Sequence, residues 1–290
     1  MAQRTSRLPE NVPGPFFVDE SCIDCAVCRH LAPTVFARSP RDLSFVARQP
    51  ASDEERVRAL MALVACPTSS IGTEPKMDAS PGVAAFPDPI GEGVYSCGFT
   101  AESSFGAWSY LVTRPAGNVL VDSPRAAEPL LKRLAELGGV RTMFLTHRDD
   151  VADHAAFQRR FGCARVLHER DVTGGTRAVE RKLAGDEPMA LAPDLVAIPV
   201  PGHTAGSSVL LYEEKFLFTG DHLMASEDDG LLHASREVCW YSWPQQIRSM
   251  ERLLDFQFEW VLPGHGGSYR ASSAGAMKEE LRRAITEMKA

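Results

Sequence analysis

Three cysteines spaced three residues apart constrain the first part of this chain more than any other feature. Cys22, Cys25 and Cys28 wrap a short loop around one object, and Cys66 follows much later beside Pro67. Because each iron of a cubane cluster needs a thiolate, this spacing indicates four ligands for a [4Fe-4S] cluster. Such a cluster would also staple a unit of about 60 residues, a size that buries little apolar surface by itself.

Three other interpretations of the cysteines remain open. A redox-active C-x-x-C disulfide would leave Cys28 and Cys66 without a function, and a structural zinc site more often uses two separated C-x-x-C pairs. Unrelated core cysteines rarely fall in this register. The remaining three of the seven cysteines, Cys97, Cys163 and Cys239, are scattered, and we expect them to be inert thiols.

The segment from Val18 to Cys28, followed by Ala32-Pro33 and Cys66-Pro67, resembles the one-cluster bacterial ferredoxins. The resemblance covers residues 14–73 and implies a small α+β ferredoxin-like domain whose cluster transfers single electrons. It also implies that the cluster is held by Cys22, Cys25, Cys28 and Cys66, inside an apolar shell of Ile23, Val27, Leu31, Phe36 and Ile71.

Local patterns predict regular structure on both sides of a breaker-rich stretch. Residues 74–91 hold four prolines and two glycines, so we predict a linker without a helix or a central strand. Before it, we expect strands at 16–19 and 43–48, a helical turn at 26–31 and a helix at 53–65 capped by Ser52. After it, strands are expected at 108–113, 118–122, 142–146, 195–200, 208–212 and 216–219, and helices at 125–137, 151–161, 244–256 and 275–288.

Alternating strands and helices predict an α/β layered domain over residues 92–290. Histidines and aspartates gather at the ends of four of its apolar strands, in segments 146–154, 201–207, 218–222 and 262–266. Imidazole and carboxylate are ligands of zinc, iron and manganese, and the glycines in the last three segments let the backbone approach a metal closely. Because sites in α/β sheets lie at the carboxyl ends of strands, the four segments predict one metal centre.

Together the four segments resemble the metallo-β-lactamase superfamily, which includes glyoxalase II, persulfide dioxygenases and flavodiiron proteins. The resemblance implies an αββα sandwich that holds two divalent metal ions, with Asp221 bridging them. By position, one metal would be held by His147, Asp149 and His203, and the other by Asp153, His154 and His265. Asp153 and Asp221 are the expected catalytic carboxylates.

The first of these segments departs from the usual H-x-H-x-D-H pattern. Asp149 stands where a second histidine is expected, and two additional residues precede Asp153 and His154. Asp149 could replace the histidine in a bulged loop, Asp150 could turn inward, or the first metal site could be weak or vacant. We favour Asp149 as a ligand, since a carboxylate is able to take that place.

The sequence does not decide whether the reaction is a hydrolysis or a redox reaction. Two bridged metals can activate water for hydrolysis. The ferredoxin-like domain argues for redox chemistry, because zinc exchanges no electrons, and aspartate in place of histidine makes the first site more oxygen-rich, which shifts its preference toward iron or manganese. We therefore favour a di-iron centre that acts on a small oxidant or on an organic or sulfur substrate. The alternatives are a hydrolase of thioesters, esters or lactones with a structural or regulatory cluster, and a non-catalytic electron-transfer protein.

Charge and hydropathy limit the partners of the chain. The net charge is −7 with interspersed signs, which disfavours a nucleic-acid partner. No apolar run is long enough to cross a membrane, and the first residues are polar and broken by Pro9 and Pro13, so we expect a cytoplasmic protein. The expected partners are a small-molecule substrate and an external electron donor. The aromatic run at 240–244 either lines the substrate pocket or staples the helix that follows.

Overall fold

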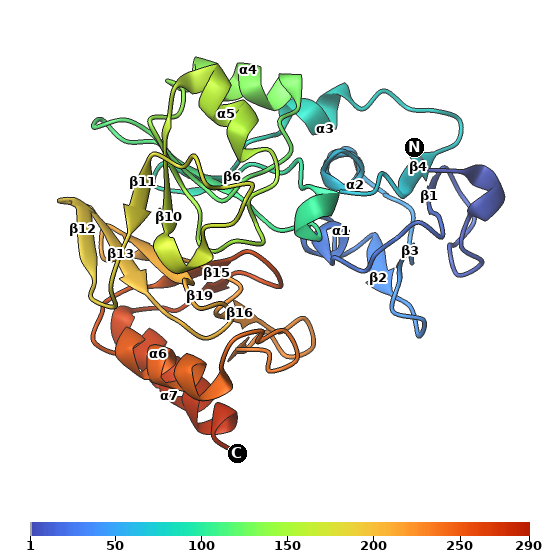
Figure 1. Cartoon of the computed structure of the whole chain (residues 1–290). Helices are drawn as coiled ribbons and strands as arrows, with labels where there is room; N and C mark the ends of the chain where they lie inside the picture. The colour runs from blue at the N-terminus through green and yellow to red at the C-terminus, as the bar shows by residue number, and fades with distance from the viewer. Residues whose placement is uncertain (1) are drawn as a thin grey trace. The chain divides into compact units, whose positions relative to one another are not determined.

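The computed structural model describes residues 2–290, which divide into two compact units (Figure 1). The first unit contains the chain up to Asn118 together with Pro124–Gly139. The second contains Val119–Ser123 and Val140–Ala290. The chain therefore crosses between the units more than once, and each unit is described separately below.

The amino-terminal part of the first unit is built from two small antiparallel strand pairs and two helices. Strand β1 (Phe16–Val18) pairs with β4 (Ile71–Thr73), and β2 (Phe36–Arg38) pairs with β3 (Ser44–Val46). A short 3-10 helix, η1, spans Arg4–Ser6. Helix α1 (Val27–Leu31) contains Cys28, and the loop before it contains Cys22 and Cys25.

Helix α2 has the bounds that its sequence predicts, Asp53–Ala65. The Ser52 hydroxyl accepts a hydrogen bond from the Glu55 amide at 3.1 Å, and three acidic residues occupy the first turn. Both features stabilise the amino end of a helix by satisfying free amides and by opposing the helix dipole. The helix ends directly at Cys66, so its last turn positions that thiol.

The prediction that residues 74–91 form no helix was wrong. Helix α3 spans Ser80–Ala84, and its proline lies in the first turn, where a missing amide hydrogen costs nothing. Strand β5 (Asp88–Gly91) pairs only with β6 (Val94–Ser96), so Pro89 lies on an edge strand, a position that tolerates proline. The prolines and glycines of this stretch therefore do not prevent a short helix and a short strand from forming.

The rest of the first unit continues this antiparallel arrangement. Strand β6 pairs with β7 (Tyr110–Val112), and the 3-10 helix η2 (Glu102–Ser104) lies in the connection between them. Helix α4 spans Glu128–Glu136 and buries Leu130, Leu131 and Leu134.

The second unit contains a parallel sheet in the order β11-β10-β9-β8. The strands are β8 (Val119–Val121), β9 (Thr142–Phe144), β10 (Ala164–His168) and β11 (Arg181–Leu183). Helix α5 (His154–Phe161) packs against β10, and the 3-10 helix η3 (Glu169–Asp171) follows that strand. Strand β8 is buried along its whole length, which is why its sequence is continuously apolar instead of alternating.

A second sheet of the same unit has the order β12-β13-β14-β15-β18-β19. Its strands are β12 (Met189–Ala192), β13 (Leu195–Pro199), β14 (Ser208–Tyr212), β15 (Phe216–Gly220), β18 (Trp260–Pro263) and β19 (Tyr269–Arg270), and β16 (Met224–Ala225) pairs with β17 (Leu232–His233) beside it. Helices α6 (Trp243–Leu253) and α7 (Ala274–Met288) lie side by side (Figure 1). They bury Met250 and Leu281 in one apolar core with the sheet residues Ile198, Val209 and Leu217.

The loops that follow β9, β13, β15 and β18 carry the histidine and aspartate segments. Their convergence in the second unit sets the position of the candidate metal centre. Across residues 2–290, every helix is too short or too polar to cross a bilayer.

Candidate metal centre and cluster site

The four predicted cluster cysteines line a single cavity in the first unit. Cys22, Cys25, Cys28 and Cys66 share this cavity with apolar side chains of Val18, Ile23, Val27 and Ile71. Three of the five residues expected in the apolar shell therefore line it, while Leu31 and Phe36 are buried in the surrounding core. Cys97 and Cys163 are buried elsewhere, as expected of inert thiols.

Backbone amides support the cysteine sulfurs. The Ser44 amide donates to Cys22 Sγ at 3.4 Å, and the Ser70 amide donates to Cys66 Sγ at 3.2 Å. Burial raises the pKa of Cys25 to about 12 and also raises the pKa of Cys28, so both groups are neutral thiols without iron. Iron binding would release these protons and remove the cost of burial. Four convergent sulfurs with amide donors fit a [4Fe-4S] cluster.

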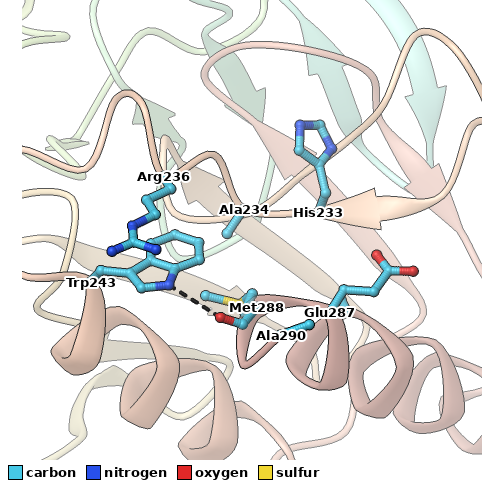
Figure 2. A pocket seen from close by; sticks show the side chains of 8 residues that line it. His233, Ala234, Arg236, Trp243, Glu287, Met288 and Ala290 are labelled. Atoms are coloured by element: carbon cyan, nitrogen blue, oxygen red, sulfur yellow. Dashed lines mark hydrogen bonds between the residues drawn. The ribbon is translucent and has the colours of Figure 1, made fainter.

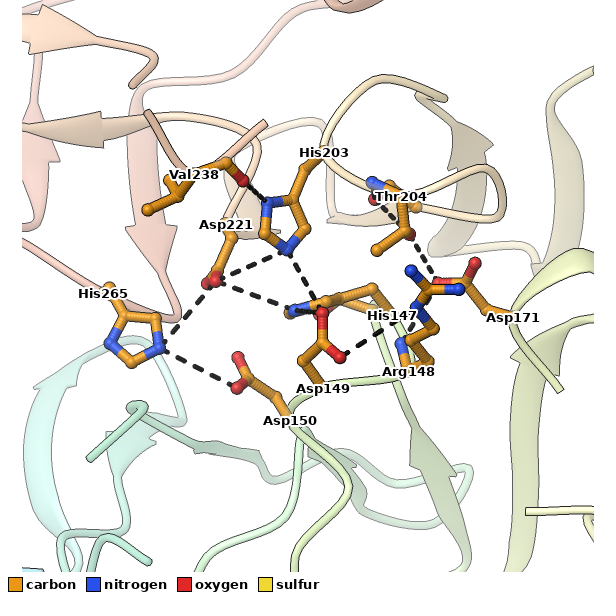
Figure 3. Close-up of polar contacts among 12 residues, drawn as sticks. His147, Arg148, Asp149, Asp150, Asp171, His203, Thr204, Asp221, Val238 and His265 are labelled. Atoms are coloured by element: carbon orange, nitrogen blue, oxygen red, sulfur yellow. Dashed lines mark hydrogen bonds and ion pairs between the residues drawn. The ribbon is translucent and has the colours of Figure 1, made fainter. Parts of the chain in front are cut away.

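In the second unit, three histidine rings point toward one carboxylate oxygen (Figure 3). Asp221 Oδ2 lies 3.7 Å from His147 Nε2, 3.7 Å from His203 Nε2 and 3.8 Å from His265 Nε2. Two ligand atoms of one tetrahedral metal lie about 3.4 Å apart when each bond is about 2.1 Å long. The observed spacings are therefore close to those around a bound ion, with Asp221 at the centre.

The first ligand group consists of His147, Asp149 and His203. Asp149 Oδ2 lies 3.8 Å from His147 Nε2 and 3.5 Å from His203 Nε2. The neighbouring His203 ring lowers the pKa of Asp149, which keeps the carboxylate ionised. Its side chain is 48% exposed, so this group is open on one side. The structure thus brings Asp149 to the position that the sequence assigned to it.

The second ligand group consists of Asp150 and His265, with Asp150 Oδ1 3.8 Å from His265 Nε2. Gly264 explains how they come so close to Asp221. A Cβ atom at this position would lie 2.6 Å from Asp150 Oδ2 and 2.7 Å from Asp221 Oδ1, so a larger residue would displace one carboxylate. Glycine is required here by the close approach of the backbone.

The structure does not bring Asp153 and His154 into either ligand group. Asp153 is exposed and precedes α5. The His154 ring is buried, with Nδ1 3.0 Å from an Arg165 guanidinium nitrogen and a further hydrogen bond to the Gly175 backbone. Because arginine can only donate, Nδ1 accepts this bond and has no lone pair left for a metal. Of the alternatives that the sequence left open, Asp150 does turn inward, and it lies where Asp153 and His154 were expected.

Several buried ligand atoms have no hydrogen-bond partner among residues 2–290. They are His147 Nε2, His203 Nε2, Asp150 Oδ2 and Asp221 Oδ1. Buried polar atoms are nearly always paired, because an unpaired one costs about 1–3 kcal/mol. All four belong to the two ligand groups and Asp221, so the donor set fits divalent metal ions.

The two histidines of the first ligand group are held with Nε2 facing the centre. The Thr146 hydroxyl donates to Asp122 at 3.0 Å, so it accepts from His147 Nδ1, also at 3.0 Å. The Val238 carbonyl, which can only accept, lies 2.6 Å from His203 Nδ1. Each Nδ1 therefore carries the proton, which leaves the Nε2 lone pair free for a metal. Thr219, at the end of β15, donates to the Leu223 carbonyl instead.

Asp171 joins the loops that carry the first ligand group. Its buried carboxylate accepts from the Thr204 hydroxyl at 2.5 Å, the Gly206 amide at 2.8 Å and the Arg148 amide at 3.1 Å. Arg148 lies between His147 and Asp149, and Thr204 follows His203 (Figure 3). One carboxylate thus fixes both loops. Sequence analysis missed Asp171 because no motif surrounds it.

The electrostatics of the centre favour a bound cation. Burial raises the pKa of Asp122 to about 8 and the pKa of Asp150 well above its usual value, and the negative charge of Asp221 adds to both shifts. Burial acts in the same direction on Asp221, but the facing rings of His265, His147 and His203 lower its pKa overall. Divalent cations between these groups would relieve the repulsion among the buried carboxylates.

The aromatic run at 240–244 contributes to two different places. Trp243 begins α6, and its indole donates to the Met288 carbonyl at the end of α7 at 3.1 Å. Figure 2 shows Trp243 in a cavity of about 270 Å3 that also contains His233 and Arg236 and none of the predicted ligands. In contrast, the amides of Trp240 and Tyr241 donate to the His203 carbonyl at 3.0 and 3.1 Å. Their side chains remain 61% and 56% exposed.

Comparisons with known proteins cover both parts of the chain. Residues 18–73 match the family described as the 4Fe-4S single cluster domain of Ferredoxin I. The metallo-β-lactamase from Hirschia baltica has 15% identity and a TM-score of 0.53, covering 69% of this chain and 95% of that chain. The metallo-β-lactamase from Pontibacter korlensis has 21% identity and a TM-score of 0.50, covering 67% of this chain and 97% of that chain. The chain joins a ferredoxin domain to a metallo-β-lactamase fold. The predicted fold class is therefore confirmed.

A curated relative of this chain is the hydroxyacylglutathione hydrolase of Synechococcus sp. strain JA-2-3B'a(2-13). The two are 31% identical over 150 residues, which is 50% of this chain and 57% of that protein. The chain therefore spans little more than half the length of this relative. At this coverage, the activity named for the relative is a basis for a proposal about this chain.

Proposed function

We propose that the metallo-β-lactamase-fold part of the chain is a dinuclear metal-dependent hydrolase of an ester or thioester. The observation that carries this proposal is the pair of ligand groups on either side of Asp221. Among residues 2–290, four of their buried atoms have no hydrogen-bond partner: His147 Nε2, His203 Nε2, Asp150 Oδ2 and Asp221 Oδ1. The 31% identity to a protein named hydroxyacylglutathione hydrolase supports hydrolysis over other reactions of a metal centre. The preference for redox chemistry drawn from the sequence has no support in that relative.

In this proposal, His147, Asp149 and His203 would hold one divalent ion, Asp150 and His265 would hold the other, and Asp221 lies between the two groups. When bound, the ions would lower the pKa of a water molecule and polarise the carbonyl of the substrate. Thr146 and the Val238 carbonyl keep the two rings of the first group in the required tautomer. Asp150 Oδ2, buried and without a hydrogen-bond partner among residues 2–290, is placed to accept a proton within the centre.

The exposed side chains near the centre indicate how a substrate would approach. Asp149 is 48% exposed, whereas His147 and Asp150 are buried. The Trp240 ring lies 6.2 Å from the His203 ring, and the backbone of its segment is fixed to His203 by hydrogen bonds. A rigid backbone that presents exposed aromatic rings is suited to an apolar or aromatic acyl group.

Zinc- or iron-loaded protein assayed with p-nitrophenyl acetate and an aryl thioester tests the hydrolase directly. We expect turnover that requires metal, is indifferent to added reductant and is abolished in Asp221→Asn. Trp240→Ala should raise KM for the aryl substrate with little change in kcat, while Leu231→Ala, which shortens an exposed apolar side chain, should change neither. Metal-loaded protein that cleaves neither substrate class would overturn the proposal.

A second candidate is a redox enzyme with iron in the same centre. Two histidines and one carboxylate, His147, His203 and Asp149, form the ligand type found in non-haem iron oxygenases. The ferredoxin domain could supply single electrons if an external donor reduced it.

Metal analysis and electron paramagnetic resonance of anaerobically purified protein separate the two candidates. Iron beyond the four atoms of the cluster, with spectral changes at both centres on reduction, would favour the redox enzyme. Cys25→Ala should then abolish reductant-dependent turnover and leave the second unit folded. Zinc in the centre, with hydrolysis that survives Cys25→Ala, would exclude electron supply as the role of the cluster.

A further inference from the structure

The family match of the ferredoxin domain ends at residue 73, and all the residues that line the cluster cavity lie within it, but the backbone around that cavity has further contacts later in the first unit. Three residues from later in the first unit contact the loop that contains Cys25, the Cys66-Pro67 segment or the helix that precedes Cys66. They are Thr100, Gly106 and Arg125.

Thr100 and Arg125 hold the carboxyl end of α2. The Thr100 hydroxyl donates to the Ala65 carbonyl at 2.7 Å, and Arg125 Nη2 donates to the Val64 carbonyl at 3.1 Å. The last carbonyls of a helix have no partner within the helix and carry its negative partial charge. The last turn of α2 contains no basic residue of its own, so the Arg125 guanidinium supplies that charge. Cys66 follows directly, and its position depends on this end of the helix.

The two residues are themselves held together. The Arg125 amide donates to the Phe99 carbonyl at 2.8 Å, and Phe99 precedes Thr100 in the chain. The same segment places Trp108 edge-on against the ring of His30 in α1, with ring centroids 6.3 Å apart. Both helices that flank the cluster cavity therefore contact residues outside the family match.

Gly106 contacts the loop that contains Cys25 and also Pro67, which follows Cys66. A Cβ atom at this position would lie 2.7 Å from Cys25 Cβ, 3.0 Å from Cys25 Sγ and 3.3 Å from the Pro67 ring. Its φ angle is +83°, a conformation that other residues avoid. Any side chain here would push against Cys25, so the glycine lets the backbone cover this thiol.

We propose that Thr100, Gly106 and Arg125 are positioning residues of the cluster. Arg125 and Thr100 fix the segment that leads to Cys66, and the Gly106 backbone shields Cys25 from solvent. Reduction potentials of iron-sulfur clusters depend on nearby charge, hydrogen bonds and solvent exposure. The three residues therefore set the potential and the lifetime of the cluster, although they lie outside the ferredoxin domain.

The first test uses Arg125→Met in the full chain, reconstituted anaerobically with iron and sulfide. Loss of the cationic hydrogen bond should lower the reduction potential and speed cluster removal by an iron chelator about 10-fold. Arg125→Lys should restore part of the potential, since it keeps the charge. Arg58→Met is the matched control, because Arg58 is paired with Asp88 on the same unit, and it should leave both quantities unchanged.

The second test uses Gly106→Ala, with Gly91→Ala as its control. Gly91 also has positive φ in the first unit, but a Cβ there meets no atom within 4 Å. Gly106→Ala should lower cluster content and alter the electron paramagnetic resonance signal, while Gly91→Ala should change neither. Thr100→Val preserves shape and replaces Arg125→Met if that variant does not fold. Wild-type potential, signal and chelator rate in these variants would overturn the proposal.

Discussion

The cluster site and the metal centre hold their ligands by different means. Three of the four cysteines lie within residues 22–28, and backbone amides of Ser44 and Ser70 support the sulfurs. The candidate metal ligands come from loops after four separate strands. Buried side chains of Thr146 and Asp171 and the Val238 carbonyl hold those loops in place.

This difference indicates how each site should respond to substitution. A site with three of its four ligands in one short loop depends on distant residues chiefly at its fourth ligand and at the backbone that covers the loop. A site assembled from four loops depends on the few groups that join them. We therefore expect the metal centre to be sensitive to residues that never contact a metal, and the following predictions test this, from the largest effect to the smallest.

Asp221→Asn should have the largest effect, because one carboxylate oxygen lies within 3.8 Å of three histidine nitrogens. We expect metal affinity to fall by more than the 10–100-fold typical of residues that only support a ligand. Titration against a chromophoric chelator measures it. Asp153→Asn is the control, and wild-type-like binding is expected since that side chain is exposed. A large loss in Asp153→Asn alone would restore the ligand set inferred from the sequence.

Asp171→Asn should lower metal affinity by about 10–100-fold, although the side chain of Asp171 is not one of the candidate ligands. The amide cannot accept all three hydrogen bonds that the carboxylate accepts from Thr204, Gly206 and Arg148. Asp186→Asn removes a surface carboxylate paired with Arg170 and should leave the affinity unchanged. The absorption spectrum of the cluster should be the same in both variants. Equal metal affinity in Asp171→Asn and Asp186→Asn would contradict the idea that buried joining residues hold the metal centre.

His154→Ala should leave metal binding intact and destabilise the fold. The substitution removes the acceptor of a buried Arg165 hydrogen bond, which costs about 1–3 kcal/mol. Urea unfolding measures the stability, and metal titration measures the binding. A His154→Ala variant that lost a metal at unchanged stability would show that the ring can reach the centre.

Glu180→Gln should have the smallest effect and should depend on pH. The hydrogen bond from Arg165 lowers the pKa of Glu180 from 4.5 to about 2. The ionised side chain therefore stabilises the fold above about pH 4.5, and this contribution disappears as the pH falls through about 2. Because Glu180 is partly exposed, we expect a loss below about 1 kcal/mol at pH 7 and none near pH 2. Urea unfolding at the two pH values measures the loss in the free energy of unfolding. An equal loss at both would contradict this prediction.

Features that depend on local spacing could be predicted from the sequence, whereas features that depend on distant contacts could not. The cysteine spacing is local, and the structure brings Cys22, Cys25, Cys28 and Cys66 around one cavity. The strand ends also predicted where His147, His203, Asp221 and His265 would meet. The choice between Asp150 and the pair Asp153 and His154 depended on Arg165 and on where α5 begins, and neither is apparent from a motif.

Other features were hidden because they arise only from tertiary contacts. Asp171 is 33 residues from Thr204 and 23 from Arg148, so its role is invisible before the chain folds. Helix α3 was missed because proline in a first turn was treated as a breaker.

Residues 122–125 give the fusion an unexpected property. Asp122 accepts from Thr146, the Ser123 amide donates to the Asp150 carbonyl at 3.1 Å, and Arg125 donates to the end of α2. Asp122 and Ser123 thus contact the metal loop of one unit, and Arg125, two residues later, contacts the cluster helix of the other. Exchanging the ferredoxin domain for that of another protein at residue 73 would remove the Val64 carbonyl to which Arg125 donates, so an engineered exchange has to restore this contact.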